Sequence, residues 1–133
     1  MSLLPHAFAE LSDDFHTRQN WEGFDNPFVV IENTELKNEL GINNLGDQQL
    51  LNIFNGTEKM ESLKPLSMVY SGHQFGQYVE QLGDGRGLLL GQISSNSALI
   101  DIHLKGAGKT PYSRFGDGRA VLRSVIREYI CCL

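Results

Sequence analysis

The residues with the clearest chemical potential are a glycine-rich segment and the arginine inside it. Residues 81–87 read QLGDGRG and contain Gly83, Gly85 and Arg86. Glycines let the backbone approach a phosphate group closely and turn several N–H groups toward one anion, and an arginine can add a charge-assisted hydrogen bond. Glycine-rich hairpin turns are also common. The segment therefore indicates either a phosphate-binding loop or a simple turn.

A lysine and a glutamate follow in an order that favours nucleotide binding. Lys105 ends an apolar run, and Glu128 lies in a helical pattern near the end of the sequence. A glycine-rich loop, a strand with lysine and a helix with glutamate is the order by which protein kinases hold ATP. A lysine at a strand end is usually solvated, and Glu128 lies off the main apolar stripe of its helix. The sequence leaves open whether Lys105 and Glu128 form an ion pair or are two separate surface residues.

The tetrapeptide Gly-Asp-Gly-Arg occurs twice, at 83–86 and at 116–119. We expect the second copy to open a helix, where N–H groups and the helix dipole favour anions. Asp117 and Gly118 are then candidate anion contacts, although Asp117 could equally be the N-cap of that helix. We expect both copies and Lys105 to line one hollow.

Two other patterns point away from alternative chemistry. Residues 106–110, GAGKT, resemble the end of a Walker A loop, but His103 stands where that pattern needs its first glycine and Pro111 follows. We therefore reject a P-loop. The four histidines are scattered, and we interpret His73, within YSGHQFG, as a structural residue of a tight loop.

The elements that must position these residues are clearest in the second half. Residues 87–93 and 98–105 predict two strands of a β-hairpin, joined by the polar turn 94–97. In the second strand the apolar side chains share one face and Lys105 the other. Residues 118–132 predict a helix with a stripe of Leu122, Ile126 and Ile130. The pattern reaches the last residues without a stop signal, so we expect a fragment of a longer protein.

The first half carries no obvious chemical group, and we interpret it as scaffold. The apolar run 28–31 predicts a short strand. Residues 35–40 predict a helix with Asn33 or Thr34 as N-cap and Gly41 as its end, and residues 48–54 predict another that ends at 55–56. We divide the chain into an N-terminal extension, 1–60, and a nucleotide-binding half-site, 61–133.

Composition excludes several classes of protein. The 133 residues are 41% hydrophobic and 20% charged, as in ordinary globular domains. A net charge of −5 makes nucleic acid a poor partner, so an anionic ligand needs locally focused positive charge. No apolar run is long enough to span a membrane. We interpret Cys131 and Cys132 as reduced and expect a cytoplasmic location.

At this point the sequence resembles a known family. The stretches YSGHQFG (70–76), QLGDGRGLLLG (81–91) and HLKGAGKTPYSRFGDGRAVLRSVIRE (103–128) closely resemble the selenoprotein O family of kinase-like proteins. The resemblance covers most of residues 68–130, whereas residues 1–60 match loosely.

The resemblance implies an α+β fold like the N-terminal lobe of a protein kinase, here incomplete. It implies ATP bound in a flipped orientation and transfer of AMP to serine, threonine or tyrosine hydroxyls of proteins. Its nucleotide contacts would be Gly83, Gly85, Arg86, Lys105, Asp117 and Gly118, with Glu128 as the partner of Lys105. The catalytic base and the Mg²⁺ ligands should follow this chain, so we expect the fragment to be inactive alone. The alternative is a non-catalytic nucleotide-binding or interaction module.

Overall fold

The computed structural model describes residues 3–4, 6–21 and 23–132. It is an α+β structure whose sheet has six strands, all paired antiparallel. The sheet elements in chain order are β1 (Leu3–Leu4), β2 (His16–Arg18), β3 (Leu66–Gln74), β4 (Gln77–Gly83), β5 (Gly87–Ser95) and β6 (Ala98–Lys105). The helical elements are the 3-10 helix η1 (Ala7–Glu10) and the α-helices α1 (Thr34–Glu39), α2 (Asp47–Asn55) and α3 (Leu122–Cys131). None of the helices in these described residues has the length and apolar character of a transmembrane helix.

Strand β5 is the centre of the sheet. It pairs with β6 along its length and with β3 and β1 on its other side, while β3 also pairs with β2 and β4. The register with β6 shifts between Leu89 and Gly91, so Leu90 is an extra residue in β5. Because one inserted residue reverses the side-chain alternation, Leu89 and Ile93 lie on opposite faces although they are four positions apart.

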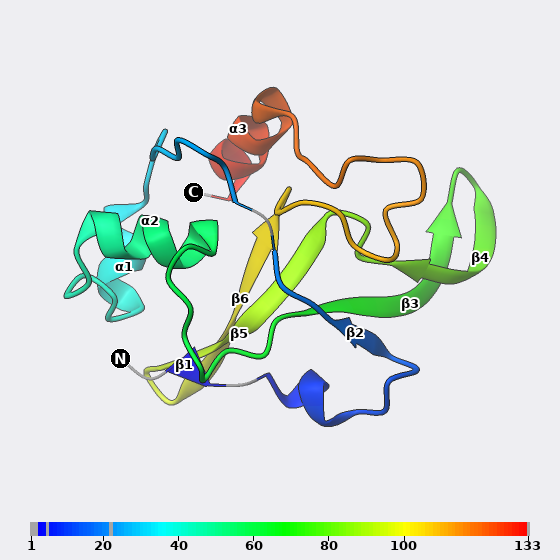
Figure 1. Ribbon diagram of the computed structural model, residues 1–133, viewed down its shortest axis with the longest axis horizontal. Helices are drawn as coiled ribbons and strands as arrows, with labels where there is room; N and C mark the ends of the chain where they lie inside the picture. Colours follow the sequence, from blue (N-terminus) through cyan, green and yellow to red (C-terminus); the bar gives the residue numbers. More distant parts are fainter. Residues whose placement is uncertain (1–2, 5, 22, 133) are drawn as a thin grey trace.

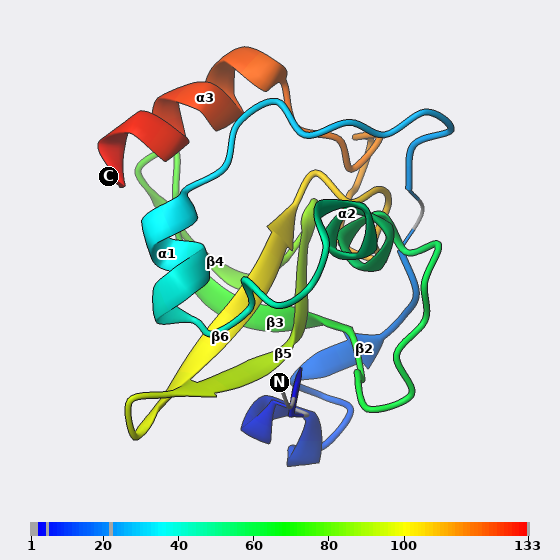
Figure 2. The ribbon, with the colours of Figure 1, turned by 90° about the vertical axis from the view of Figure 1, so that its left-hand side faces the viewer.

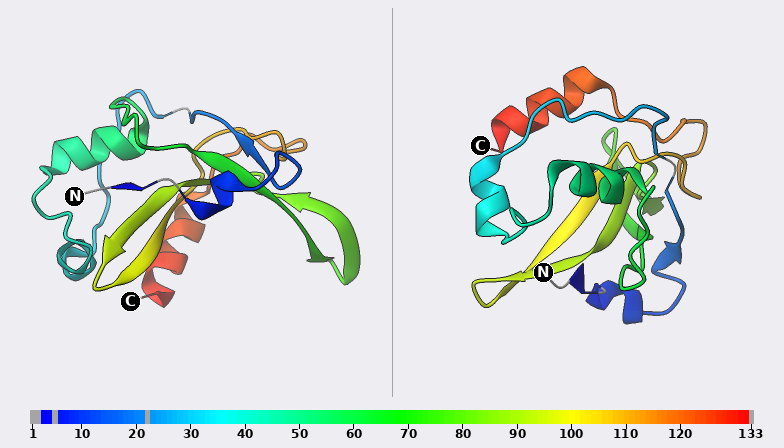
Figure 3. Two further views of the ribbon diagram at one scale, coloured as in Figure 1. Left: turned by 90° about the horizontal axis from the view of Figure 1, so that it is seen from below. Right: turned by 60° about the vertical axis from the view of Figure 1, so that its left-hand side comes forward.

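Each face of β5 therefore has its own hydrophobic cluster. Ile93 packs with Leu40, Ile42 and Leu50 of the α1–α2 region and with Leu63, which follows α2. On the other face Leu89 packs with Leu66 and with Ala9 of η1. In the left view of Figure 3, α2 and α3 lie on opposite sides of the β5–β6 hairpin.

The two short helices have the ends that the sequence predicts. Asn33 is the N-cap of α1, and its side chain accepts a hydrogen bond from the Leu36 N–H. Gly56, with φ of 78°, ends α2 in the left-handed conformation. Lys37 of α1 donates to Glu32 and to Asp47 at the start of α2, and these bonds raise the pKa of Lys37 above its ordinary value. Both helix predictions are confirmed.

The predicted hairpin of the second half is also confirmed, as strands β5 and β6. Both strands extend to a two-residue turn, where Asn96 and Ser97 have φ of 47° and 67°. Positive φ at both positions is the geometry that fits the twist of antiparallel strands. Ile100 and Ile102 pack toward the α1–α2 region, and Lys105 lies on the other face.

A second hairpin was missed. Strands β3 and β4 extend away from the body of the molecule (Figures 1 and 3). His73 lies on β3, exposed and in edge-on contact with the Tyr78 ring, and the turn is Phe75-Gly76. The interpretation of His73 as part of a tight loop is therefore wrong.

Two element boundaries also differ from expectation. Residues 28–31 form no strand but an exposed connection, with Phe28 77% accessible. Helix α3 begins at Leu122, and its N-cap is Val121, so Asp117 is not the cap. Gly118 has φ of 71°, which is incompatible with a right-handed helix, and this delays the helix start. Helix α3 lies at the edge of the molecule in Figure 2, and its stripe of Leu122, Ile126 and Ile130 is exposed.

Candidate functional site

The first Gly-Asp-Gly-Arg copy forms the turn between β4 and β5, with Asp84 as its anchor. The Asp84 N–H donates to the Met68 carbonyl, and Asp84 Oδ2 accepts from the Met68 N–H, both at 3.0 Å. His103 Nε2 lies 3.6 Å from the same carboxylate oxygen, and the Asp84 side chain is only 10% exposed. Asp84 is therefore part of the scaffold of the turn, and its carboxylate faces β3 and β6.

A tyrosine beside this turn, Tyr70, has a pKa that is shifted by its surroundings. Tyr70 on β3 donates its hydroxyl to the Gly83 carbonyl at 3.3 Å. Burial and the negative charge of Asp84 raise the pKa of Tyr70 above its ordinary value of 10.0. The phenol is therefore protonated at neutral pH. Its hydroxyl can donate one hydrogen bond, and its oxygen can accept a hydrogen bond.

Lys105 ends β6 opposite Gly87, the first residue after the turn. Its Nζ forms an ion pair with the Glu128 carboxylate of α3. The hydrogen bond from Lys105 lowers the pKa of Glu128, and the charge of Arg86 lowers it further. Both partners are about half exposed, so water screens the pair. The pair nevertheless brings α3, β6 and the first turn to one place.

The second Gly-Asp-Gly-Arg copy is a bend in the connection between β6 and α3. Asp117 Oδ1 accepts from the Arg119 N–H at 2.9 Å, and the Gly108 N–H donates to the Gly118 carbonyl at 3.2 Å. The Arg119 guanidinium lies 4.5 Å above the Phe24 ring and donates to the Gly23 carbonyl. This copy is therefore attached to the N-terminal half of the chain.

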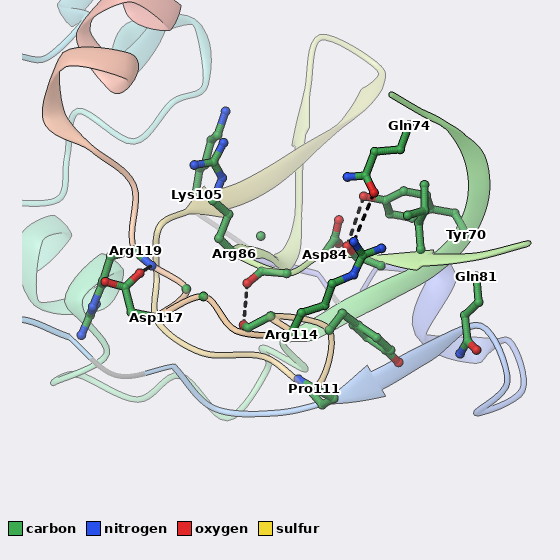
Figure 4. Close-up of a pocket in the computed structure, with 18 of the residues that line it drawn as sticks. Tyr70, Gln74, Gln81, Asp84, Arg86, Lys105, Pro111, Arg114, Asp117 and Arg119 are labelled. Atoms are coloured by element: carbon green, nitrogen blue, oxygen red, sulfur yellow. Dashed lines mark hydrogen bonds between the residues drawn. The ribbon is translucent and has the colours of Figure 1, made fainter. Parts of the chain in front are cut away.

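The two copies and Lys105 line one open cleft of about 1030 Å³. All six residues singled out as nucleotide contacts are among its lining residues, and Glu128 adjoins the cleft through Lys105. Figure 4 shows Asp117 and Arg119 at the left of the cleft, and Lys105 and Arg86 above and to the right of them. The cleft is as large as the upper end of usual ligand pockets, roughly 300–1,000 Å³.

The cleft concentrates positive charge in an acidic chain. Its charged lining residues are three arginines, one lysine and two aspartates, namely Arg86, Arg114, Arg119, Lys105, Asp84 and Asp117. Each of the two aspartates accepts a hydrogen bond from a backbone N–H. The surplus of cations over carboxylates gives the local field that an anionic ligand needs, although the whole chain has a net charge of −5.

Several lining residues were not identified from the sequence. Tyr70, Gln74 and Gln81 come from the missed β3–β4 hairpin. Arg114 has φ of 53° and donates to Gln74 at 3.2 Å, and Figure 4 shows this bond. No local rule predicts a left-handed arginine. His103 could have been found, because it shares the polar face of β6 with Lys105.

The carboxylates of the cleft do not make a metal site by themselves. Within residues 3–4, 6–21 and 23–132, no group of three histidine, cysteine or acidic side chains is placed to hold a metal ion. Asp84 is directed to Met68 and His103, and Asp117 to Arg119. The residues present therefore fit an anion better than a divalent cation.

Comparison with known proteins gives consistent results. The family profile described as "Protein adenylyltransferase SelO" matches residues 3–133. A protein named "Protein nucleotidyltransferase YdiU" from Vibrio parahaemolyticus is 50% identical over 127 residues, which are 95% of this chain and 26% of that protein. Proteins of the same name from Vibrio atlanticus and Stutzerimonas stutzeri are 54% and 48% identical over 129 and 128 residues. The chain spans about a quarter of the length of these relatives, covering 26% or 27% of each.

Proposed function

This chain belongs to the SelO family of protein adenylyltransferases, and from that membership we propose that it carries the ATP-binding half-site of an enzyme that transfers AMP to proteins. The observation that carries the proposal is the convergence of Lys105 and the two Gly-Asp-Gly-Arg copies on one basic cleft. We also propose that β5, β6 and α3, with the Lys105–Glu128 pair, correspond to the nucleotide-binding lobe of a protein kinase.

The proposed contacts divide by chemistry. Lys105 and Arg86 neutralise the outer two phosphates of a flipped ATP, with Glu128 holding the Lys105 amine in place. The backbones of Gly83 and Gly85 form the wall on one side, and Asp117 and Gly118 form it on the other. Holding the outer phosphates in this way leaves the α-phosphorus open to the acceptor hydroxyl, so positioning and charge neutralisation supply the catalysis.

The proposed reaction is a substitution at that phosphorus. The oxygen of a serine, threonine or tyrosine of the protein substrate forms a bond to the α-phosphorus, and the bond to the bridging oxygen of the β-phosphate breaks. Pyrophosphate leaves, and the hydroxyl proton passes to a general base. Mg²⁺ would offset the charge of the phosphates. Because Asp84 and Asp117 are already engaged, we place the base and the metal ligands outside residues 1–133.

The binding part of the proposal can be tested on this chain alone. Calorimetric titration with ATP should show binding, and Lys105→Ala should weaken it by about tenfold or more, because a charge-assisted contact is lost. Lys59→Ala, outside the cleft, is the matched control. Equal affinity in the Lys105→Ala variant and the unaltered chain would refute the assignment of Lys105.

The transfer part needs a longer protein. We suggest replacing the corresponding region of the Vibrio parahaemolyticus relative with this chain and supplying ATP labelled at either the α or the γ position. Label should enter protein only from the α position, because AMP transfer keeps that phosphorus. Label entering only from the γ position would show a phosphotransferase and would overturn the AMP-transfer proposal.

One observation favours a second candidate, a non-catalytic interaction module. Three apolar residues of α3, Leu122, Ile126 and Ile130, are 55%, 37% and 62% exposed, and an exposed apolar stripe is typical of a binding surface. If this chain binds no ATP but associates with itself in sedimentation experiments, and if Ile126→Glu abolishes that association, the second candidate replaces the first.

A further inference from the structure

The connection from Gly106 to Ser113 is in contact with the whole of the glycine-rich turn. Its sequence resembles a Walker A ending, but its role in the structure is different. The Thr110 hydroxyl donates to the Asp84 carbonyl at 2.7 Å, and the Ser113 hydroxyl donates to the Gly85 carbonyl at 2.6 Å. The Gly106 N–H donates to the next carbonyl, that of Arg86, at 2.7 Å. Three consecutive carbonyls of the turn are therefore all bound by one segment.

The two hydroxyls can point in only one direction. Thr110 Oγ1 accepts from the Tyr112 N–H at 3.1 Å, and Ser113 Oγ accepts from the Thr110 N–H at 2.8 Å. A hydroxyl has a single proton, so each must give that proton to the carbonyl of the turn. The Ser113 N–H also donates to the Thr110 carbonyl at 3.1 Å, so reciprocal bonds fix the segment itself, and both residues are half-buried.

Tyr112 adds a fourth attachment. A β-carbon at Gly83 would overlap the Tyr112 ring, and one at Gly85 would lie 2.8 Å from the Tyr112 carbonyl oxygen. The Tyr112 hydroxyl lies 2.7 Å from Thr17 Oγ1 on β2. The absence of side chains at positions 83 and 85 therefore allows close packing of this segment, and the segment in turn ties the turn to the edge of the sheet.

We propose that residues Thr110–Ser113 are a positioning element, here named the turn clamp, which holds the glycine-rich turn in its ligand-binding conformation before the ligand arrives. A free glycine-rich turn would lose much conformational entropy when a phosphate binds it. The clamp removes that cost in the unliganded chain, which increases affinity through preorganisation. Its two carbonyl contacts turn these acceptors of the turn away from an anion, while Arg86 lines the cleft together with Lys105. The effect on ATP affinity rests on the proposed function, whereas the effect on the turn itself does not.

The experiment uses Thr110→Val and Ser113→Ala, singly and together, because each removes a hydroxyl with little change in shape. Thr110→Ser keeps the hydroxyl and is the rescue variant. Thr57→Val is the matched control, since Thr57 Oγ1 also donates to a backbone carbonyl, that of Asn52, and Thr57 does not line the cleft. Amide hydrogen exchange at residues 85–87 and calorimetric titration with ATP are measured for each variant, with circular dichroism to confirm folding.

We expect the double variant to exchange residues 85–87 faster and to bind ATP about tenfold more weakly, the loss expected for two hydrogen bonds. Thr110→Ser, which keeps the hydroxyl, should show the exchange rate and the ATP affinity of the unaltered chain. Thr57→Val should change neither quantity. Unchanged exchange at 85–87 in a folded double variant would overturn the clamp. If the unaltered chain binds no ATP, the proposed function fails, while faster exchange confined to residues 85–87 would still support the clamp.

If the double variant proves unfolded, Tyr112→Phe provides a milder test. It removes only the hydroxyl that meets Thr17 and keeps the ring on Gly83. We expect a smaller increase in exchange at residues 85–87 with folding intact. No increase in exchange for Tyr112→Phe and for each single variant would overturn the proposal.

Discussion

The two Gly-Asp-Gly-Arg copies have the same four residues and different structures. In the first, the Asp84 side chain is only 10% exposed and is bonded to Met68, and Arg86 lies near Glu128. In the second, Asp117 is exposed and bonded to the Arg119 N–H, and Arg119 lies on Phe24. The first copy is fixed by two strands and by the 106–113 connection, whereas the second is fixed by the Gly108 backbone and the N-terminal half. The comparison teaches that the neighbours of a short repeat, more than its letters, determine its geometry.

The largest effect should come from the last glycine of the second copy. Gly118 has φ of 71°, and a β-carbon there would overlap the Gly108 carbonyl. Gly118→Ala should lower the free energy of unfolding by roughly 3 kcal/mol, from left-handed strain and overpacking together. Urea denaturation measures this.

Substitutions at two other glycines separate the cost of left-handed strain from the cost of overpacking. Gly41 has φ of 66° with no atom near its β-carbon position, so Gly41→Ala should cost only about 1 kcal/mol, the strain alone. Gly85 has no positive φ but meets the Tyr112 carbonyl, so Gly85→Ala should cost roughly 1–3 kcal/mol. Equal losses at Gly118 and Gly41 would show that the contact with Gly108 contributes nothing.

The aspartates should differ next. Asp84→Ala leaves the Met68 N–H without its acceptor, so we expect a loss of about 2 kcal/mol in unfolding free energy. Asp117→Ala removes an exposed bond to the Arg119 N–H and should cost less than about 1 kcal/mol. Thermal unfolding of both variants checks the order, and a larger loss for Asp117→Ala would reverse the roles assigned to the two copies.

Substitution of Arg86 should mainly weaken ATP binding, whereas substitution of Arg119 should mainly lower the stability of the fold. Arg86→Gln should weaken ATP binding by about tenfold with little change in unfolding temperature. Arg119→Gln removes the stacking on Phe24 and the bond to the Gly23 carbonyl, so it should lower stability by about 1 kcal/mol and affect affinity less. Calorimetry with unfolding curves measures both quantities. Similar losses of affinity in the two variants would mean that both arginines contact the nucleotide.

The smallest effect concerns Glu128, whose pKa lies below its ordinary value of 4.5. A lowered folded-state pKa stabilises the folded chain above the unfolded pKa, and that stabilisation is lost as pH falls through the folded pKa. Because the pair is exposed, the loss should be small. Carboxyl NMR titration should show the pKa of Glu128 rising in Lys105→Ala and, less, in Arg86→Gln. Arg119→Gln should leave it unchanged, and a rise there would contradict the separation of the two copies.

The sequence predicted the elements that follow local rules. The β5–β6 hairpin, the α1 and α2 caps and the outward face of Lys105 depend on alternation, capping residues and turn residues within a few positions. The α+β class was what the resemblance implied, and the predicted hairpin agreed with it. The position of the cleft required the order of elements along the chain, which the kinase pattern supplied.

The misses have two causes, an unusual local turn and contacts between residues that are distant in sequence. The β3–β4 hairpin turns at Phe75-Gly76, where no usual turn dipeptide stands, and its strands are rich in polar residues. Residues 28–31 are apolar but have no strand partner, so their composition suggested a strand that does not form. Helix α3 starts later than predicted because the bond to Gly108 holds Gly118 in a left-handed conformation. Arg114 and Tyr112 line the cleft through contacts with residues that are distant in sequence.

The extra residue at Leu90 has a consequence for how the molecule comes apart. Because β5 reverses its faces there, the strand supplies Leu89 to one hydrophobic cluster and Ile93 to the other. Neither cluster can melt while the other stays intact, since both would lose the same strand. The cluster that Leu89 forms with η1 and β3 and the cluster that Ile93 forms beside α1 and α2 should therefore unfold in a single cooperative transition.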